Sequence, residues 1–319
     1  MKKVAKTDKF PKIADVVVLM LLFLVAQTAV LLLLPLFGVT LPVTSAIDTV
    51  PVETYIAEQE SLAKYCALYY PLSMLLPILL MWLYLRLRGG KGVIRIRCSA
   101  AGLNPSVILV GVLWLLSSQI VLEPLVLMLP KHQSPGVGLG VWAYITTIGF
   151  APILEEILCR GLLFEAFHKR WGVKISILLS ALFFGIIHFD PATAVVALFA
   201  GLIFGVLYVR TSSIFASMIV HAINNALAFM LITIEKDDVP FREIVGNDKI
   251  YYIIYGVAAV IFIAASVEAF FKLRAKKEEP ATETTEEVEE VEVSERAEEV
   301  AETDVRKVKI EENNEEVEG

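Results

Sequence analysis

The sequence predicts an all-α, polytopic membrane protein with about eight transmembrane helices and both termini in the cytoplasm. Its 319 residues are 56% hydrophobic and only 20% charged, whereas soluble domains average roughly 45–50% apolar and about 25% charged residues. Eight apolar stretches approach the length of about 20 residues that a helix needs to cross a bilayer. Basic residues gather in alternate loops between these stretches, as the positive-inside rule expects.

The eight stretches begin close to the first residues and continue to the start of a polar tail. The first stretch is too long for the core of a signal peptide, so we expect it to be retained. The fifth and sixth are separated only by Asp190-Pro191, which predicts a tight helical hairpin. In order, the stretches cover roughly residues 13–37, 62–86, 106–129, 141–167, 173–189, 192–209, 213–234 and 250–272.

The orientation follows from the charges of the loops. Lysine and arginine residues precede the first stretch and follow the second, fourth, sixth and eighth stretches. The other loops are acidic or neutral, and the one before the second stretch contains Glu53, Glu58 and Glu60. Because cytoplasmic loops carry the excess of positive charge, both termini are expected in the cytoplasm. The predicted location is an integral, multi-pass position in the plasma membrane.

The chain divides by composition into three parts. Residues 1–140 hold three predicted helices with their loops, and residues 141–277 hold a helical core and the last helix. Residues 278–319 contain 18 acidic and 4 basic residues. Such a segment buries too little apolar surface to fold, so we expect a disordered cytoplasmic tail. The body before it has 24 basic and 17 acidic residues, and no nucleic-acid partner is expected.

Ionisable side chains inside the predicted spans are the main functional signal, because burying them in a bilayer is costly. The fourth stretch contains Glu155-Glu156 and Arg160, the fifth contains His188, and the seventh contains His221 and Asn225. A helical rise of about 1.5 Å per residue puts Glu155, His188 and Asn225 each about 20 Å from the cytoplasmic end of its own stretch. The sequence therefore predicts that three helices bring these groups to one site near the membrane midplane.

The spacing of these residues indicates which groups pair and which stay free. Glu156 and Arg160 are four residues apart, so they share a helix face and can form an ion pair. Glu155 points about 100° away from Glu156 on the same helix and is left for chemistry. His221 and Asn225 are also four apart and face one cavity.

Two kinds of chemistry fit this set of side chains. A carboxylate near two imidazoles and an amide can activate water and stabilise an oxyanion. Alternatively, Glu155, His188 and His221 can bind a divalent metal such as zinc. The sequence leaves both open, and it predicts no other cofactor. The three cysteines, Cys66, Cys98 and Cys159, are too few and scattered for a disulfide framework or a CxxC metal site.

The three motifs together resemble the CAAX-protease and bacteriocin-processing (CPBP) family of intramembrane proteases, which includes the type II CAAX prenyl endopeptidases. That family carries the patterns EExxxR, FxxxH and HxxxN on successive helices. The resemblance covers roughly residues 141–226, and the order of the motifs makes it specific. In this chain the patterns are Glu155-Glu156…Arg160, Phe184…His188 and His221…Asn225.

The resemblance implies hydrolysis of a peptide bond in or near the membrane, within an eight-helix fold. Carried over by position, Glu155 is the expected general base for water, assisted by His188. His221 and Asn225 are the expected oxyanion-stabilising groups. The expected substrate is a membrane-associated peptide or protein in the bilayer, and the sequence leaves open whether it is lipidated. The supporting residues are expected to be Glu156, Arg160 and Phe184.

Two other functional classes also fit the sequence. A non-proteolytic membrane scaffold or a bacteriocin-immunity-type protein would keep the same fold without cleaving anything. A transporter would use the central polar cluster as a solute or proton site. The chain has no evident inverted repeats or Gly/Pro-broken half-helices of the kind typical of transporters, which counts against that class.

Further polar and small residues have expected structural roles. Ser117, Ser118, Gln119 and Glu123 of the third stretch are expected to form hydrogen bonds between helices. Glu165 lies at the end of the fourth stretch and is expected to be solvated. Gly201 and Gly205 form a GxxxG pattern that predicts close approach of the sixth stretch to a neighbouring helix.

Overall fold

The computed structural model describes residues 10–46, 49–89, 96–130, 136–234 and 239–275, and among these residues the regular elements are all helices, without any β-strand. This confirms the predicted all-α class. The chain divides into two units, residues 1–269 and 270–319, and all three motifs belong to the first unit. The predicted disordered tail, residues 278–319, lies outside the described residues.

Six helices are long and apolar enough to cross a membrane within the described part of the chain. The fourth predicted stretch is instead divided into short helical segments, and the fifth forms the second half of a kinked helix. The count of eight spans and the cytoplasmic termini therefore stay predictions. The six helices are α1 (Ile13–Leu33, extended by the 3₁₀ turn η1, Leu34–Phe37), α2 (Val52–Gly89), α3 (Pro105–Val126), α7 (Pro191–Thr211), α8 (Ile214–Thr233) and α10 (Asp248–Ala275).

Helix α2 begins ten residues earlier than its hydrophobic stretch predicts. Its 38 residues span about 57 Å at a rise of about 1.5 Å per residue, so α2 extends beyond a hydrocarbon core of about 30 Å or tilts within it. Glu53 and Glu58 are therefore helical rather than in a loop, a difference that hydropathy could not reveal because glutamate is a good helix former. Glu58 also accepts a hydrogen bond from the backbone N–H of Ser45, at 2.6 Å.

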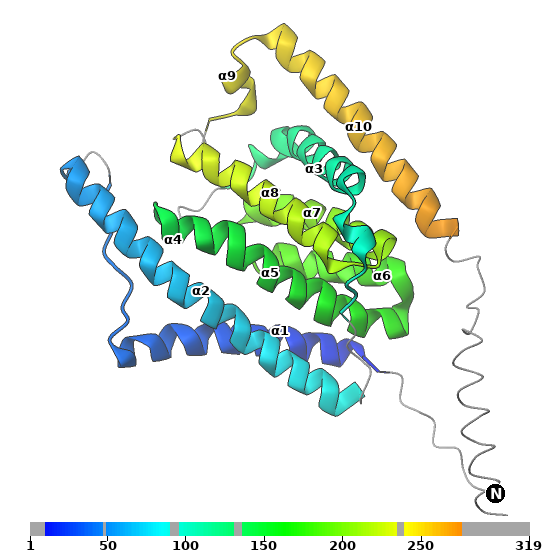
Figure 1. The fold of residues 1–319 in the computed structure, drawn as a ribbon, viewed down its shortest axis with the longest axis horizontal. Coiled ribbons are helices and arrows are strands. Elements are labelled where there is room, and N and C mark those ends of the chain that lie inside the picture. Colours follow the sequence, from blue (N-terminus) through cyan, green and yellow to red (C-terminus); the bar gives the residue numbers. More distant parts are fainter. Residues whose placement is uncertain (1–9, 47–48, 90–95, 131–135, 235–238, 276–319) are drawn as a thin grey trace, which may run out of the picture. The chain divides into compact units, whose positions relative to one another are not determined.

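A proline in α2 creates an attachment point for α1. Pro77 has no N–H, so the carbonyl of Ser73, four residues earlier, cannot form its helical hydrogen bond. Gln27 of α1 donates its Nε2–H to that carbonyl at 2.9 Å. Nearer the start of α1, the buried Asp15 accepts from Arg88 of α2 at 3.2 Å. These contacts join α1 to the second half of α2, and the two helices diverge towards the end of α1 and the start of α2, as Figure 1 shows.

The segment that carries the first motif runs as one rod between α2 and α8 (Figure 1). It consists of α4 (Val141–Tyr144), the π-helical segment η4 (Ile145–Phe150), α5 (Ala151–Glu156), the π-helical segment η5 (Ile157–Phe164) and the first part of α6 (Glu165–Ile186), which is kinked at Gly172. π-helical turns inside α-helices are rare and frequent at functional sites. Their presence explains why this apolar stretch is not one regular helix.

Pro152 and the first π-helical segment together leave the backbone carbonyl of Thr147 without a helical hydrogen bond. The N–H of Ala151 donates to the carbonyl of Thr146, five residues earlier. In that register the carbonyl of Thr147 would accept from residue 152, which is a proline without an N–H. The Thr147 carbonyl is therefore left available for a side chain from another helix.

The predicted hairpin at Asp190-Pro191 is confirmed as the junction of α6 and α7. Phe189 has a left-handed backbone, with φ of 58°, that reverses the chain. Asp190 is the N-cap of α7 and accepts the N–H of Thr193 at 2.8 Å, and Pro191 occupies the first turn, where no N–H is needed.

The GxxxG pattern of α7 makes the predicted close approach, and the neighbour is α6. A Cβ at Gly201 would lie 3.0 Å from Cα of Ala181, and a Cβ at Gly205 would lie 3.0 Å from Cγ2 of Ile177. Both contacts are tighter than ordinary van der Waals packing. The absence of side chains at these two positions therefore lets α7 lie directly on α6, which carries the second motif.

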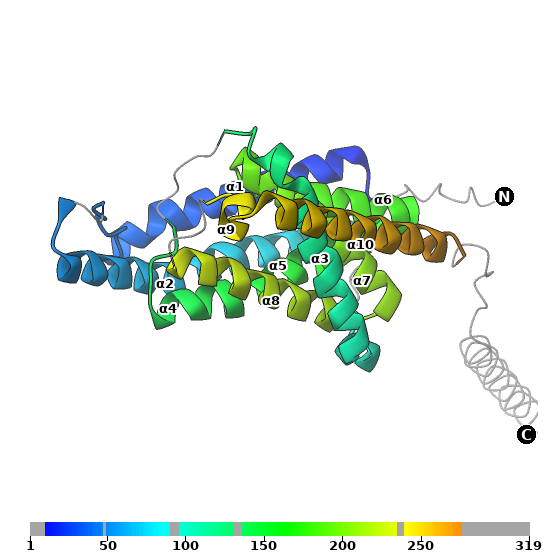
Figure 2. The same ribbon diagram turned by 90° about the horizontal axis from the view of Figure 1, so that it is seen from above.

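Helix α10 lies along α3 and α7 (Figure 1 and Figure 2). Trp114 of α3 donates its indole N–H to Ser266 at 3.2 Å, and Phe199 of α7 contacts Phe262 with ring centroids 6.4 Å apart. On its other side α10 exposes Val257, Val260 and Ile263. Such an apolar outer face is what a helix in contact with lipid requires.

Candidate active site

A fully buried ion pair forms the base of the motif cluster. Glu156 and Arg160 both have 0% exposure, and Nη1 of Arg160 lies 2.7 Å from Oε1 of Glu156. Nη2 of Arg160 also donates to the backbone carbonyl of Gly201 on α7, at 2.8 Å. The ion pair predicted from the four-residue spacing is confirmed, and it additionally fixes the first-motif helix to α7.

Two aromatic rings enclose the guanidinium group. Cζ of Arg160 lies 5.2 Å from the ring centre of Phe184 and 5.3 Å from that of Phe204, distances at which a cation is attracted to an aromatic face. Phe204 also stacks on His221, with ring centroids 4.9 Å apart. Phe204 was not predicted as part of the site, because its position in an apolar helix gives no signal that separates it from other packing residues.

His221 of α8 lies between the two glutamates of α5. Its Nδ1 is 3.3 Å from Oε1 of Glu156, and its Nε2 is 3.6 Å from Oε2 of Glu155. Two carboxylates and one guanidinium leave a negative charge in this buried set, and a proton on His221 would balance it. His221 is thus the side chain that contacts both glutamates of the first motif.

The two carboxylate oxygens of Glu155 have different surroundings. Oε1 accepts a hydrogen bond from the phenol of Tyr70 on α2. Oε2 is buried, faces Nε2 of His221 and has no hydrogen-bond partner among the described residues. Glu155 as a whole is 8% exposed. Tyr70 was not predicted as a site residue, since it is one of several tyrosines in α2 and belongs to no motif.

His188 lies just after α6 ends and reaches the cluster through Phe184. Its Nδ1 is 2.7 Å from the backbone carbonyl of Phe184, one of the carbonyls that a helix C-terminus leaves without a helical partner. A carbonyl oxygen only accepts, so Nδ1 is the donor in this contact, and in the neutral ring Nε2 is then an acceptor. The ring of Phe184 lies 5.0 Å from the ring of His188 and 5.5 Å from that of His221. Within the described residues, His188 forms no hydrogen bond or ion pair with Glu155.

Asn225 is held by the carbonyl that Pro152 releases. Its Nδ2 donates to the Thr147 carbonyl at 3.0 Å, and its Oδ1 lies 3.4 Å from Nδ2 of Asn224. Gln119 of α3 in turn donates to Asn224. An amide nitrogen has two N–H groups, so Asn225 retains one for a further partner.

The polar residues of α3 only partly behave as predicted. Gln119 forms the expected interhelical hydrogen bond, whereas Ser117 and Ser118 donate to carbonyls of their own helix, at 2.9 and 2.6 Å.

The prediction that Glu165 is solvated is wrong. Glu165 is buried, lies 2.7 Å from Nε of Arg97 and accepts from the phenol of Tyr208 at 2.7 Å. Its cationic partner comes from the segment before α3, which the local sequence around Glu165 does not reveal.

The residues predicted for a metal do not gather around a common point. Among the described residues, no group of three or more His, Cys, Asp or Glu side chains is arranged to hold a metal ion. Both nitrogens of His221 face carboxylates, and Nδ1 of His188 is engaged by a backbone carbonyl. The divalent-metal alternative for Glu155, His188 and His221 stays a prediction.

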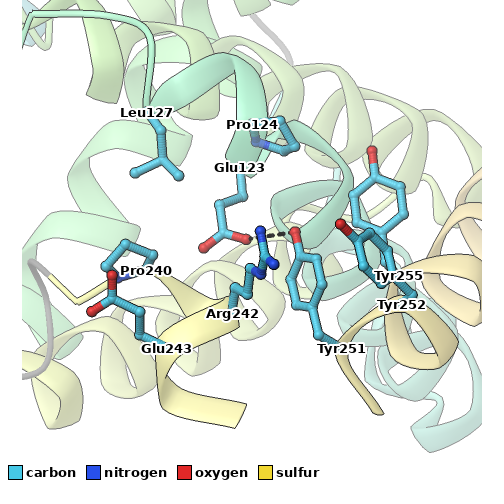
Figure 3. Close-up of a pocket in the computed structure, with 9 residues that line it drawn as sticks. All are labelled: Glu123, Pro124, Leu127, Pro240, Arg242, Glu243, Tyr251, Tyr252 and Tyr255. Carbon is cyan, nitrogen blue, oxygen red and sulfur yellow. Dashed lines mark hydrogen bonds between the residues drawn. The ribbon is translucent and has the colours of Figure 1, made fainter. Parts of the chain in front are cut away.

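A separate pocket of about 450 Å³ lies where the end of α3 meets α9 (Phe241–Val245) and the start of α10 (Figure 3). Two of its charged groups are engaged with neighbours: Glu123 accepts from the N–H of Phe241 and from the phenol of Tyr251, and Arg242 binds both carboxylate oxygens of Asp248 at 2.8 and 2.9 Å. This network attaches α9 and α10 to α3. The pocket contains none of the motif residues and is lined by Glu123, Pro124, Leu127, Pro240, Arg242, Glu243, Tyr251, Tyr252 and Tyr255.

Comparison with known proteins agrees with the motif cluster. Residues 137–227 match the family model described as type II CAAX prenyl endopeptidase Rce1-like. The predicted family resemblance is confirmed over this segment. The Rce1-like segment includes every residue of the three motifs but neither Tyr70 nor Gln119. No curated protein and no solved structure matches the chain.

The match and the helices together define the protein in broad terms. The Rce1-like segment is similar to endopeptidases. Six helices of sufficient length and apolarity indicate an integral, multi-pass membrane protein.

Proposed function

We propose that this protein is an intramembrane endopeptidase of the plasma membrane that uses Glu155 to activate water. The observation that best supports this role is the state of Glu155 Oε2, which is buried, lacks a hydrogen-bond partner among the described residues and faces an imidazole at 3.6 Å. A buried carboxylate oxygen without a partner is unfavourable unless a ligand or water satisfies it. A bound water molecule would do so and would be in contact with a base.

The proposed reaction adds water across a peptide bond. Oε2 of Glu155 accepts a proton from the water as its oxygen forms a bond to the carbonyl carbon of the substrate. The carbon–nitrogen bond then breaks, and the proton passes from Glu155 to the departing amine. General acid–base catalysis of this kind typically contributes about 10²- to 10⁴-fold to a rate.

The remaining polar groups are assigned to the oxyanion and to the water. The second N–H of Asn225 and the ring of His221 are the proposed donors to the oxyanion, an interaction that is strong in a water-poor site. His188 is the proposed acceptor of a hydrogen bond from the water, through the Nε2 that its contact with the Phe184 carbonyl leaves free. Glu156 and Arg160 hold the helix that carries Glu155 in register with α7.

The proposed substrate is a membrane-associated protein or peptide, with or without a lipid group. Its identity can be found together with the activity, by profiling protein termini across the proteome of host cells. Cells with the wild-type protein would be compared with cells that express Glu155→Gln at the same level. Glu155→Gln keeps the shape of the side chain but removes the base. New termini near membrane boundaries are expected only with the wild type.

A matched control is Glu123→Gln, which makes the same chemical change in α3 within the separate pocket. This variant is expected to give the wild-type profile. Identical profiles for wild type and Glu155→Gln, under several growth and stress conditions, would contradict the proposal. That result would favour the alternative of a non-proteolytic scaffold or an immunity-type protein with the same fold.

A further inference from the structure

Tyr70 is the one described side chain from outside the Rce1-like segment that forms a hydrogen bond with Glu155. It lies on α2, which packs along α4, η4, α5 and η5. Its phenol donates to Oε1 of Glu155 across a separation of 85 residues in the sequence. The N-terminal helices therefore contribute directly to the geometry of the motif cluster.

The hydrogen bond makes the two oxygens of Glu155 inequivalent. A free carboxylate can rotate about its last bond, because a terminal sp³–sp² torsion is broad. Tyr70 occupies Oε1, and a hydrogen bond to an ionised acceptor is roughly twice as strong as one between neutral groups. Oε2 is thereby turned towards His221 and left without a partner among the described residues.

We propose that Tyr70 is a positioning residue that fixes the Glu155 carboxylate so that Oε2 meets the attacking water. This inference rests on the proposed function. Tyr70 does not exchange a proton with the substrate. It holds the base in one orientation and completes the hydrogen bonding of the oxygen that takes no part in the reaction.

The neighbouring Tyr69 provides a matched control within the same helix. Its ring stacks on Tyr65 with centroids 5.6 Å apart, and within the described residues its phenol makes no hydrogen bond to the motif cluster. Tyr70→Phe and Tyr69→Phe each remove one hydroxyl group from adjacent positions of α2. Only the first change removes a hydrogen bond to Glu155.

The test measures kcat and KM in proteoliposomes, on a substrate found by terminal profiling. Tyr70→Phe is expected to lower kcat by about 10- to 100-fold, the loss that follows from removing a hydrogen bond to a charged group. KM is expected to change less than about threefold, because the phenol does not touch the substrate. Tyr69→Phe is expected to leave both constants unchanged. Unchanged kcat in Tyr70→Phe, or an equal loss in Tyr69→Phe, would overturn the inference.

A double variant separates positioning from a general effect on folding. In the Glu155→Gln background, Tyr70→Phe is expected to cause no further loss of residual activity, since residues that act as a unit are not additive. A further loss of about 10-fold or more would mean that Tyr70 acts elsewhere. Rates are expressed per folded molecule, with the protection of the buried Cys159 thiol as the measure of folding.

The same experiment distinguishes failure of this inference from failure of the proposed function. Full activity in Glu155→Gln removes Glu155 from the chemistry and, with it, any role for Tyr70 as its positioning residue. An inactive Glu155→Gln together with a fully active Tyr70→Phe overturns only the inference about Tyr70.

Discussion

Replacing Arg160 with methionine is expected to lower the free energy of unfolding by about 3–5 kcal/mol, the cost of leaving a buried charge without its partner. Glu156 is fully buried and lies 2.7 Å from the guanidinium, so water cannot replace the lost cation. The Gly201 carbonyl also loses its donor. Methionine fills much of the volume of the removed side chain, which keeps the effect of a cavity small.

Arg210→Met is the control for this prediction. Arg210 and Glu268 are 3.4 Å apart, with side chains 30% and 44% exposed. An exposed pair of this kind contributes about 0–1 kcal/mol. The same arginine-to-methionine change therefore separates the effect of burial from the effect of losing a positive charge.

Unfolding can be followed through the buried thiol of Cys159. This side chain is 0% exposed, so a thiol reagent reaches it only when the helices separate. Cys66 and Cys98 are more accessible and would be changed to serine in all proteins compared. The rate of labelling in detergent at increasing temperature or denaturant then gives the stability of each variant.

Equal stability losses in Arg160→Met and Arg210→Met would refute the reasoning. A second result bears on the same point. Removing both members of the buried pair, in Glu156→Leu/Arg160→Met, is expected to cost less than Arg160→Met alone, since no orphaned carboxylate remains. A double variant that is less stable than Arg160→Met would show that the buried charge is not the cause.

Two further predictions concern the contacts between helices. Gln27→Leu is expected to lower the free energy of unfolding by about 0.6–1 kcal/mol in the wild type. The loss is expected to be smaller in a Pro77→Ala background, where the restored N–H can pair with the Ser73 carbonyl. Thiol labelling of the wild type, the two single variants and the double variant checks this, and equal losses in both backgrounds would contradict it. Gly201→Ala is expected to cost about 1–3 kcal/mol and to reduce cleavage, because the added Cβ would lie 3.0 Å from the backbone of α6. Gly256→Ala adds a methyl group where no atom lies within 4 Å and is expected to be neutral; comparable losses in the two glycine variants would argue against close packing as the reason.

Hydropathy and charge were sufficient to predict the helical class and most helix positions. The Asp190-Pro191 hairpin was predicted because only these two residues separate two apolar stretches, and such a short break is visible in the local sequence. The Glu156–Arg160 pair followed from helical periodicity for the same reason. Features that depend on neighbours in the sequence could thus be predicted.

Features that depend on distant partners could not. Tyr70 meets Glu155 and Arg97 meets Glu165 only after α2 and the segment before α3 have packed against the motif helices. The motifs indicated that His221 belongs to the site, but not that it lies between both glutamates. That arrangement depends on how α8 is rotated about its axis and how far it is shifted along α5. The similar membrane depths estimated for the motif residues determine neither the rotation nor the shift.

The residues of the proposed centre lie on separate segments that are synthesised one after another. Tyr70 enters the membrane first, Glu155 follows, and His221 and Asn225 arrive only with α8. Because domains of a growing chain fold as their segments become available, a chain that stops before α8 holds two buried glutamates and one arginine without the imidazole that completes the set. A chain that has not yet inserted α8 cannot assemble the proposed hydrolytic centre, so activity is acquired only after α8 has entered the membrane.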